Sequence, residues 1–212
     1  MSTYVTEEQQ IEMLKEWWKR NGNFAIGLFF VAIFFSLGLH YWYKHREEKL
    51  ARASAHYEVM LSALVNADEA TTLKEANLLK DDYSRTPYAA LAALIFARND
   101  VDQQKYNDAE TELTWVMNHG NTNSLRQIAR LRLARIDIQL NKPKDALNVL
   151  DKVSDSSYMP MIDEVRGDAY LALNQTDNAR EAYQKAVNLL PSFAVARPLL
   201  TMKLNDLATG NK

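Results

Sequence analysis

An uncharged stretch of twenty residues, 24–43, divides the chain close to its N-terminus. It reads FAIGLFFVAIFFSLGLHYWY and contains no Asp, Glu, Lys or Arg. As an α-helix it would be about 30 Å long, which matches the hydrocarbon core of a bilayer. A lone spanning segment must be helical, because only a helix satisfies its backbone hydrogen bonds internally. The pattern therefore predicts one transmembrane helix that follows a tail of residues 1–23.

The flanks of this stretch indicate an uncleaved anchor. A signal-peptide apolar region is usually about 7–15 residues long and ends at small residues. Here the run passes into Tyr41, Trp42 and Tyr43, and such aromatic rings sit at the headgroup level of a membrane. The alternative, a buried helix of a soluble protein, is disfavoured by twenty uncharged residues rich in phenylalanine. Three basic residues precede the span closely and four follow it, so charge leaves the orientation open.

The tail has a helical pattern of its own. Thr6 and Gln9 fit a capping box, and Ile11, Leu14 and Trp18 fall on one face of a helix. Such a helix would either lie on the inner membrane surface or bind a cytoplasmic partner, and we favour the surface helix.

Beyond residue 43, apolar residues recur at steps of three and four, and no run alternates as a strand would. The rest of the chain is therefore predicted to be all-α. A helix over residues 44–65 continues from the span, and a second helix covers residues 71–83. Together they form a stalk and a divergent first hairpin, residues 44–85.

A repeated spacing marks residues 86–191. The order small, aromatic, Ala, aromatic, Ala, Pro is typical of a tetratricopeptide repeat, and it occurs at Gly167, Tyr170, Ala179, Tyr183, Ala186 and Pro191. Two earlier copies keep the twelve-residue step between small residues, at Ala97 and Ala109 and at Ala134 and Ala146. Small residues suit close helix crossings. Three copies in register favour an α-solenoid of three repeats over a generic helical bundle.

The copies depart from the pattern in two ways. Asp100 and Asp137 stand where the repeat has an aromatic residue. The step from Ala109 to Ala146 is 37 residues, which predicts extra residues around 119–123. A C-terminal capping helix follows in residues 192–212, where Pro198 either kinks the helix or marks its true start.

Composition and motifs argue against a catalytic site and against nucleic-acid binding. After the span there are 22 basic and 23 acidic residues, so no basic field is available for nucleic acid. The chain has no cysteine, and its four histidines lack the spacing of a metal site. No phosphate-binding loop, nucleophile elbow or zinc-protease motif occurs. We therefore predict no enzyme, no metal and no cofactor.

Function must then come from a surface. In tetratricopeptide repeats the first helix of each pair lines a groove. Aligning the three copies gives nine candidate partner-binding residues, Leu94, Arg98, Val101, Leu131, Arg135, Ile138, Glu164, Asp168 and Leu171. The apolar rows would hold a peptide, and the arginines would bind its carboxylates or carbonyls. The alternative is that these arginines are ordinary solvated residues.

The whole layout resembles the YfgM family, the ancillary subunits of the bacterial SecYEG translocon. The likeness is carried by the single span and by residues 17–22, 41–42, 51–57, 131–147 and 165–183. The resemblance implies a single-pass protein of the cell inner membrane with a cytoplasmic N-terminus and a periplasmic repeat domain.

The same resemblance implies partners. They are the SecYEG translocon, a membrane-anchored periplasmic chaperone of the prolyl-isomerase-like type, and a cytoplasmic stress-response regulator that would involve the tail. The implied role is an adaptor that links translocated proteins to periplasmic chaperones, and the family has no catalytic residues to transfer. The alternative is a structural scaffold of another envelope complex.

Overall fold

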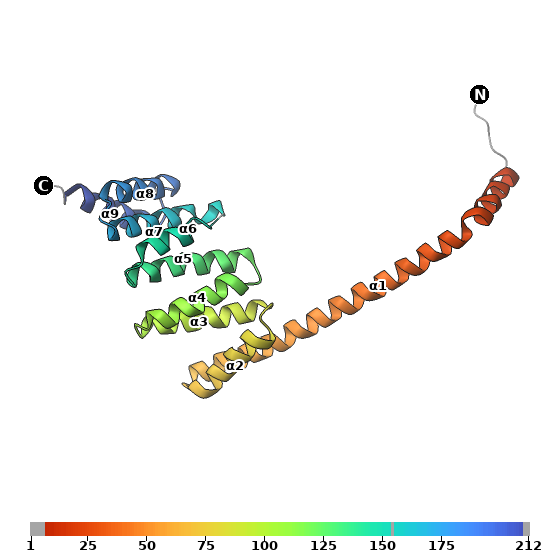
Figure 1. Cartoon of the computed structure of the whole chain (residues 1–212), viewed down its shortest axis with the longest axis horizontal. Helices are drawn as coiled ribbons and strands as arrows, with labels where there is room; N and C mark the ends of the chain where they lie inside the picture. The colour runs from red at the N-terminus through yellow and green to blue at the C-terminus, as the bar shows by residue number, and fades with distance from the viewer. Residues whose placement is uncertain (1–6, 154, 210–212) are drawn as a thin grey trace, which may run out of the picture. The chain divides into compact units, whose positions relative to one another are not determined.

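The computed structural model describes residues 7–153 and 155–209, and every regular element within them is helical, which confirms the all-α prediction. Thr6 of the expected capping box lies outside the described residues. The elements (Figure 1) are α1 Glu7–Val65, α2 Glu69–Asp82, α3 Pro87–Asp102, α4 Tyr106–His119, α5 Asn123–Gln139, α6 Pro143–Leu150, the 3₁₀ turn η1 Ser156–Tyr158, α7 Met159–Ala172, α8 Thr176–Leu189 and α9 Arg197–Thr209.

Helix α1 runs without interruption through the tail, the uncharged stretch and the stalk. The chain divides into two compact units, residues 1–51 and 52–212, so the last turns of α1 belong to the second unit. In the first unit, the phenylalanine side chains are exposed, for example Phe24 by 74% and Phe34 by 71%. Among the described residues, α1 is the one helix long and apolar enough to cross a membrane. This exposure disfavours a soluble core helix, which would bury its aromatic residues.

The second unit is built from helix pairs that pack on their neighbours in sequence. Three successive buried clusters join α1, α2 and α3, then α3, α4 and α5, and then α5, α6 and α7. Helices α7, α8 and α9 continue the stack. Because each pair touches only the adjacent pairs, the arrangement is the α-solenoid predicted from the repeat.

The helix starts follow from local chemistry. The carboxylate of Asp68 accepts a hydrogen bond from the Thr71 amide at the start of α2, and the hydroxyl of Thr122 accepts one from Leu125 at the start of α5. Such side chains satisfy amides that have no partner inside the helix. Pro87 and Pro143 stand in the first turns of α3 and α6, where a missing N–H costs nothing.

A fourth helix pair shares the register of the three predicted repeats. The paired small residues of the repeats are all buried, and 37 residues before Ala97 and Ala109 stand Met60 and Thr72, which are buried too. The hairpin of α1 and α2, expected to be divergent, therefore places residues at the same two positions. Its sequence does not reveal this, because neither methionine nor threonine is a small residue.

Identical turns close all four pairs. The residues Ala67, Gln104, Asn141 and Asn174 have φ between 56° and 61°. In each turn the next amide donates to the carbonyl five residues back, as Lys105 does to Asp100 at 2.7 Å and Lys142 to Asp137 at 2.7 Å. This is the Schellman arrangement, which ends a helix through a left-handed residue. The common turn explains why the register survives a change of step from 37 to 33 residues.

The extra residues of the longer step do not all lie in the loop at 119–123. Helix α5 begins at Asn123, eleven residues before Ala134, whereas α7 begins at Met159, eight residues before Gly167. On the other side of the loop, α4 ends at His119, ten residues after Ala109, whereas α6 ends at Leu150, four residues after Ala146. The extra length therefore lies in the end of α4 and the start of α5. This was not visible in the sequence, because the polar residues around 119–123 look like loop.

Helix α9 caps the stack. It begins at Arg197, so Pro198 marks its start and does not kink it. The Arg197 guanidinium donates to the carbonyls of Val187 and Leu190, at 2.8 and 2.7 Å, and so satisfies the end of α8. Leu200 is fully buried in the cluster that contains Tyr183. A terminal repeat needs such a cover, because its apolar face would otherwise meet water.

We predict that Gly167→Ala destabilises the repeat unit. A Cβ at this position would overlap the buried ring of Tyr183. Alanine gains about 1 kcal/mol of helix propensity, but overpacking costs about 1–3 kcal/mol, and the overpacking outweighs the gain because the clash is with a ring that cannot move. Thermal and urea unfolding of the repeat unit measure the difference. Lys144→Ala on α6 is the control, because it changes an exposed side chain of the same unit. Equal stability of G167A and the unsubstituted protein would show that this crossing does not set the packing of α7 on α8.

Candidate functional site

A hollow of about 590 Å³ opens on the first helices of the repeats. We call it the α3–α5 hollow, and its wall consists of Tyr57, Leu91, Leu94, Ile95, Ala97, Arg98, Val101, Leu113, Arg132, Arg135 and Ile136. These residues come from the end of α1 and from α3, α4 and α5. The volume lies within the roughly 300–1,000 Å³ typical of ligand sites. The wall is therefore mainly apolar, with three guanidinium groups as its charged members.

The three arginines differ in their partners. Arg98 donates from Nε to both oxygens of Asp102, at 3.2 and 3.0 Å, and both side chains are exposed. Arg135 lies 3.7 Å from Glu164, which is a loose ion pair. Arg132 is exposed and has no ion pair or hydrogen bond with any residue that the structure describes. Exposed ion pairs contribute little, so the pair of Arg98 and Asp102 can be exchanged for another at small cost.

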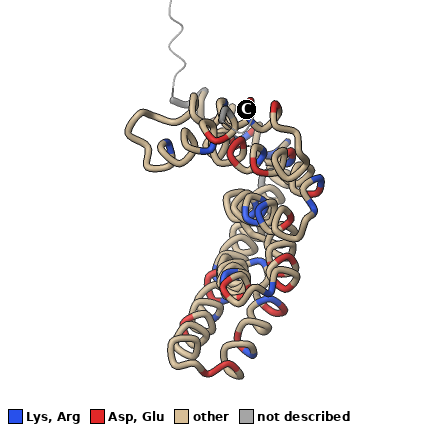
Figure 2. The backbone as a smooth tube through the Cα atoms, turned by 90° about the vertical axis from the view of Figure 1, so that its left-hand side faces the viewer, with Lys and Arg blue, Asp and Glu red and all other residues tan. Residues whose placement is uncertain are grey.

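Helix α5 supplies most of this positive charge. It carries Arg126, Arg130, Arg132 and Arg135, and its one acidic residue, Asp137, is buried. Elsewhere, residues of both signs are interspersed along the backbone (Figure 2). Of these four arginines, Arg132 and Arg135 line the α3–α5 hollow, where they join Arg98 of α3.

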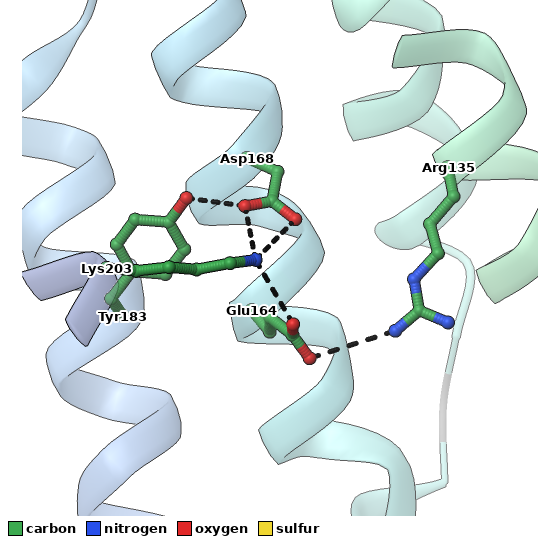
Figure 3. A network of polar contacts seen from close by, with 5 residues as sticks. All are labelled: Arg135, Glu164, Asp168, Tyr183 and Lys203. Carbon is green, nitrogen blue, oxygen red and sulfur yellow. Dashed lines mark hydrogen bonds and ion pairs between the residues drawn. The ribbon is translucent and has the colours of Figure 1, made fainter. Parts of the chain in front are cut away.

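The next stretch of the groove is acidic, and it is occupied by α9 (Figure 3). The ammonium of Lys203 donates to Asp168 at 2.8 and 3.0 Å and to Glu164 at 3.2 Å. The hydroxyl of Tyr183 donates to Asp168 at 2.5 Å. Burial, and then this hydrogen bond, raise the pKa of Tyr183 above its ordinary value. Asp168 stands at the position of Arg98 and Arg135 in the earlier repeats, and here the positive charge comes from Lys203 of α9.

The structure brings four of the nine predicted residues together at the α3–α5 hollow, namely Leu94, Arg98, Val101 and Arg135. Leu131 and Ile138 instead pack in the cluster shared with α6 and α7. Glu164 and Asp168 belong to the Lys203 network, and Leu171 is exposed.

Sequence reasoning missed Arg132, Leu91, Ile95 and Tyr57. A spacing signal existed for Arg132, which stands three residues before Arg135 and so shares its helix face. Leu91 and Ile95 have the same relation to Leu94 and Arg98. No spacing in the sequence placed Tyr57 at the groove, because its helix was not recognised as part of a repeat.

Buried aspartates take the place of the repeat's aromatic residue. Asp137 is only 3% exposed, and burial, together with the charges of Glu110 and Asp145, raises its pKa from 3.8 to about 6. Lys142 opposes this rise and also donates to Glu110 at 2.7 Å. Asp100, 37 residues earlier, has a raised pKa through burial and the neighbouring Asp108 and Glu112. Both lie in the helix ends that lead into the Schellman turns.

The chain is similar to known proteins along nearly its whole length. A family model for the tetratricopeptide repeat-like domain matches residues 15–209. A protein of Aggregatibacter actinomycetemcomitans named ancillary SecYEG translocon subunit is 31% identical over 209 residues, which are 98% of this chain and 100% of that protein. The chain belongs to this family. Members with the same name in Haemophilus influenzae and Escherichia coli K12 are 29% and 27% identical over the same shares.

Family membership confirms the resemblance found in the sequence. The family's repeat domain and its name point to a non-catalytic protein. No group of three or more His, Asp or Glu side chains that could hold a metal occurs in the part of the chain that the structure describes. The groove on the repeat helices is therefore the main candidate for function.

We predict that Asp137 makes stability depend on pH. Because its folded-state pKa is near 6 and its ordinary value is 3.8, the folded state binds more protons between these values, and stability falls as the pH rises through that window. Asp137→Asn should remove this fall and be more stable at pH 7 by on the order of 2 kcal/mol.

Urea unfolding at a series of pH values measures this effect. Asp177→Asn is the control, because Asp177 is 94% exposed. An unchanged pH profile in D137N would contradict the assignment.

Proposed function

We propose that this chain is a membrane-anchored adaptor that associates with the SecYEG translocon and links translocated proteins to periplasmic chaperones. The observation that carries the proposal is the similarity to ancillary SecYEG translocon subunits along 98% of the chain. A likeness of that extent includes the anchor as well as the repeats. The α3–α5 hollow supplies a surface on which a partner can bind.

The anchor is α1. The apolar side chains that the structure describes between residues 24 and 43 are exposed, and a lipid bilayer would bury them. Trp17 and Trp18 precede the uncharged stretch, and Tyr41, Trp42 and Tyr43 end it, at the depth where aromatic belts form. We place the protein in the cell inner membrane as a single-pass protein, with residues 1–23 in the cytoplasm and the repeat unit in the periplasm.

The repeat unit would bind its partner through the groove. A membrane-anchored chaperone of the prolyl-isomerase-like type is the proposed periplasmic partner, because an anchor on both proteins would hold them at the same membrane surface. Binding by both anchor and groove raises the effective concentration of one site for the other. The groove itself can therefore be weak and still maintain the complex.

The tail offers a second surface, on the cytoplasmic side. Ile11, Leu14 and Trp18 are all more than half exposed. We propose that this face lies on the inner membrane surface, and a cytoplasmic stress-response regulator that binds the tail is the alternative partner.

We predict that the tagged full chain, purified from membranes in mild detergent, carries the SecYEG proteins with it. The expectation follows from an anchor and a repeat surface that act together. Replacing residues 24–43 by an unrelated spanning helix should lower the yield of SecYEG if the span takes part in the contact. Absence of SecYEG, with co-elution of a different envelope complex, would contradict the proposal and support a structural scaffold.

We also predict the orientation. A reporter that is active only in the periplasm should be active when fused after Lys212 and inactive when fused at residue 23, because a single crossing separates the two positions. Reporter activity in cells measures both fusions. The reverse pattern would overturn the periplasmic placement of the repeat unit while leaving the anchor intact.

A further inference from the structure

We infer that the α3–α5 hollow recognises a peptide segment in which acidic side chains are interspersed with bulky apolar ones. This inference rests on the proposed function, because it assumes that the groove is where a partner binds. What it adds is the chemistry of the partner.

The charge of the wall favours an anion. Arg98, Arg132 and Arg135 all line one hollow, and the residues that line it include no Asp or Glu. Arg132 has no ion pair with a described residue, so a partner carboxylate can bind it without displacing anything. Guanidinium groups bind carboxylates through paired N–H donors, which makes a carboxylate the anion that suits these arginines.

The chain itself shows which group these arginines accept. Arg98 holds the carboxylate of Asp102 with two hydrogen bonds, and Arg135 faces that of Glu164 at 3.7 Å. Arg98 and Asp102 lie four residues apart on exposed helix surface. Pairs of this kind contribute only a few tenths of a kcal/mol, so a partner carboxylate can replace Asp102 at little cost.

The apolar part of the wall determines which side chains flank the acidic residue of the partner peptide. Leu91, Ile95 and Val101 present aliphatic surface, and Tyr57 adds an aromatic ring. Aliphatic or aromatic side chains of the partner would bury this surface, whereas a uniformly acidic segment would leave it in water. The site therefore discriminates against both a purely apolar and a purely acidic segment.

The neighbouring stretch of the groove limits where the acid can bind. Glu164 and Asp168 share the single ammonium group of Lys203, so two negative charges face one positive charge, and a further carboxylate is disfavoured there. An acidic segment is thus confined to the repeats of α3 and α5, and α9 ends the usable groove.

The test uses the full chain in lipid nanodiscs and three fluorescent peptides of about twelve residues, a length suited to a groove ligand. The peptides share the same Leu and Phe positions and carry Glu, Gln or Lys at the positions between them. Fluorescence anisotropy should give the Glu peptide about tenfold tighter binding than the Gln peptide and weakest binding for the Lys peptide, with the preference shrinking at high salt.

Variants of the arginines then locate the preference. Arg132→Glu should weaken binding of the Glu peptide by about tenfold or more and improve binding of the Lys peptide, because the like charge repels the ligand. Arg132→Lys should retain part of the preference. Lys144→Glu on α6 makes the same change of charge at an exposed position outside the hollow, and it should change binding by less than about twofold. Because Arg132 is exposed and has no partner to lose among the described residues, these variants should fold, and circular dichroism checks this.

Equal binding of the three peptides, binding of none, or an equal effect of R132E and K144E would overturn the inference. The outcome of this test and the outcome of the SecYEG co-purification are independent. If the tagged chain carries SecYEG but binds the three peptides alike, the adaptor role stands and the acidic preference is wrong. If the Glu preference is found but SecYEG does not co-purify, the preference stands and the translocon association is wrong.

Discussion

The close crossing of two helices at small residues is the constraint on which the rest of this structure depends. Ala97 meets α4, Ala134 meets α6, and Gly167 lies against the ring of Tyr183. In these three pairs a Schellman turn joins the crossing helices, and the α1–α2 pair has the same turn with Met60 and Thr72 at the aligned positions. The four turns repeat one geometry, and therefore each pair presents its first helix to the same side of the stack.

Because the geometry repeats, sequence differences between the repeats change the charge of the groove along its length. At one aligned position the chain has Arg98, Arg135 and Asp168, so the groove changes from basic to acidic along its length. The basic part is open and forms the α3–α5 hollow. The acidic part is closed by Lys203 of α9, which also ends the stack. One helix thus both covers the terminal apolar face and limits the groove.

The sequence predicted the features that depend on local spacing and missed those that depend on size or tertiary contact. The length of the uncharged stretch and the twelve-residue step between small residues are local, and both could be read directly. The hairpin of α1 and α2 could not, because Met60 and Thr72 occupy the crossing with larger side chains. Nor could the sequence place Lys203 on Glu164, since 39 residues separate them and only the packing of α9 joins them. Arg132 could have been predicted in part. It shares the helix face of Arg135, but the alignment of the repeats took only one arginine from that face.

The central claim is that the groove, on an anchored repeat unit, is where a partner of the secretion machinery binds. Site-specific photo-crosslinking in living cells tests it most directly, with the crosslinking amino acid at Val101 in the α3–α5 hollow and, in a matched strain, at the exposed Asn148 of α6. The account predicts adducts with a SecYEG subunit or a periplasmic chaperone from position 101 and none from position 148. Adducts that are absent at position 101, or equally strong at both, would contradict it.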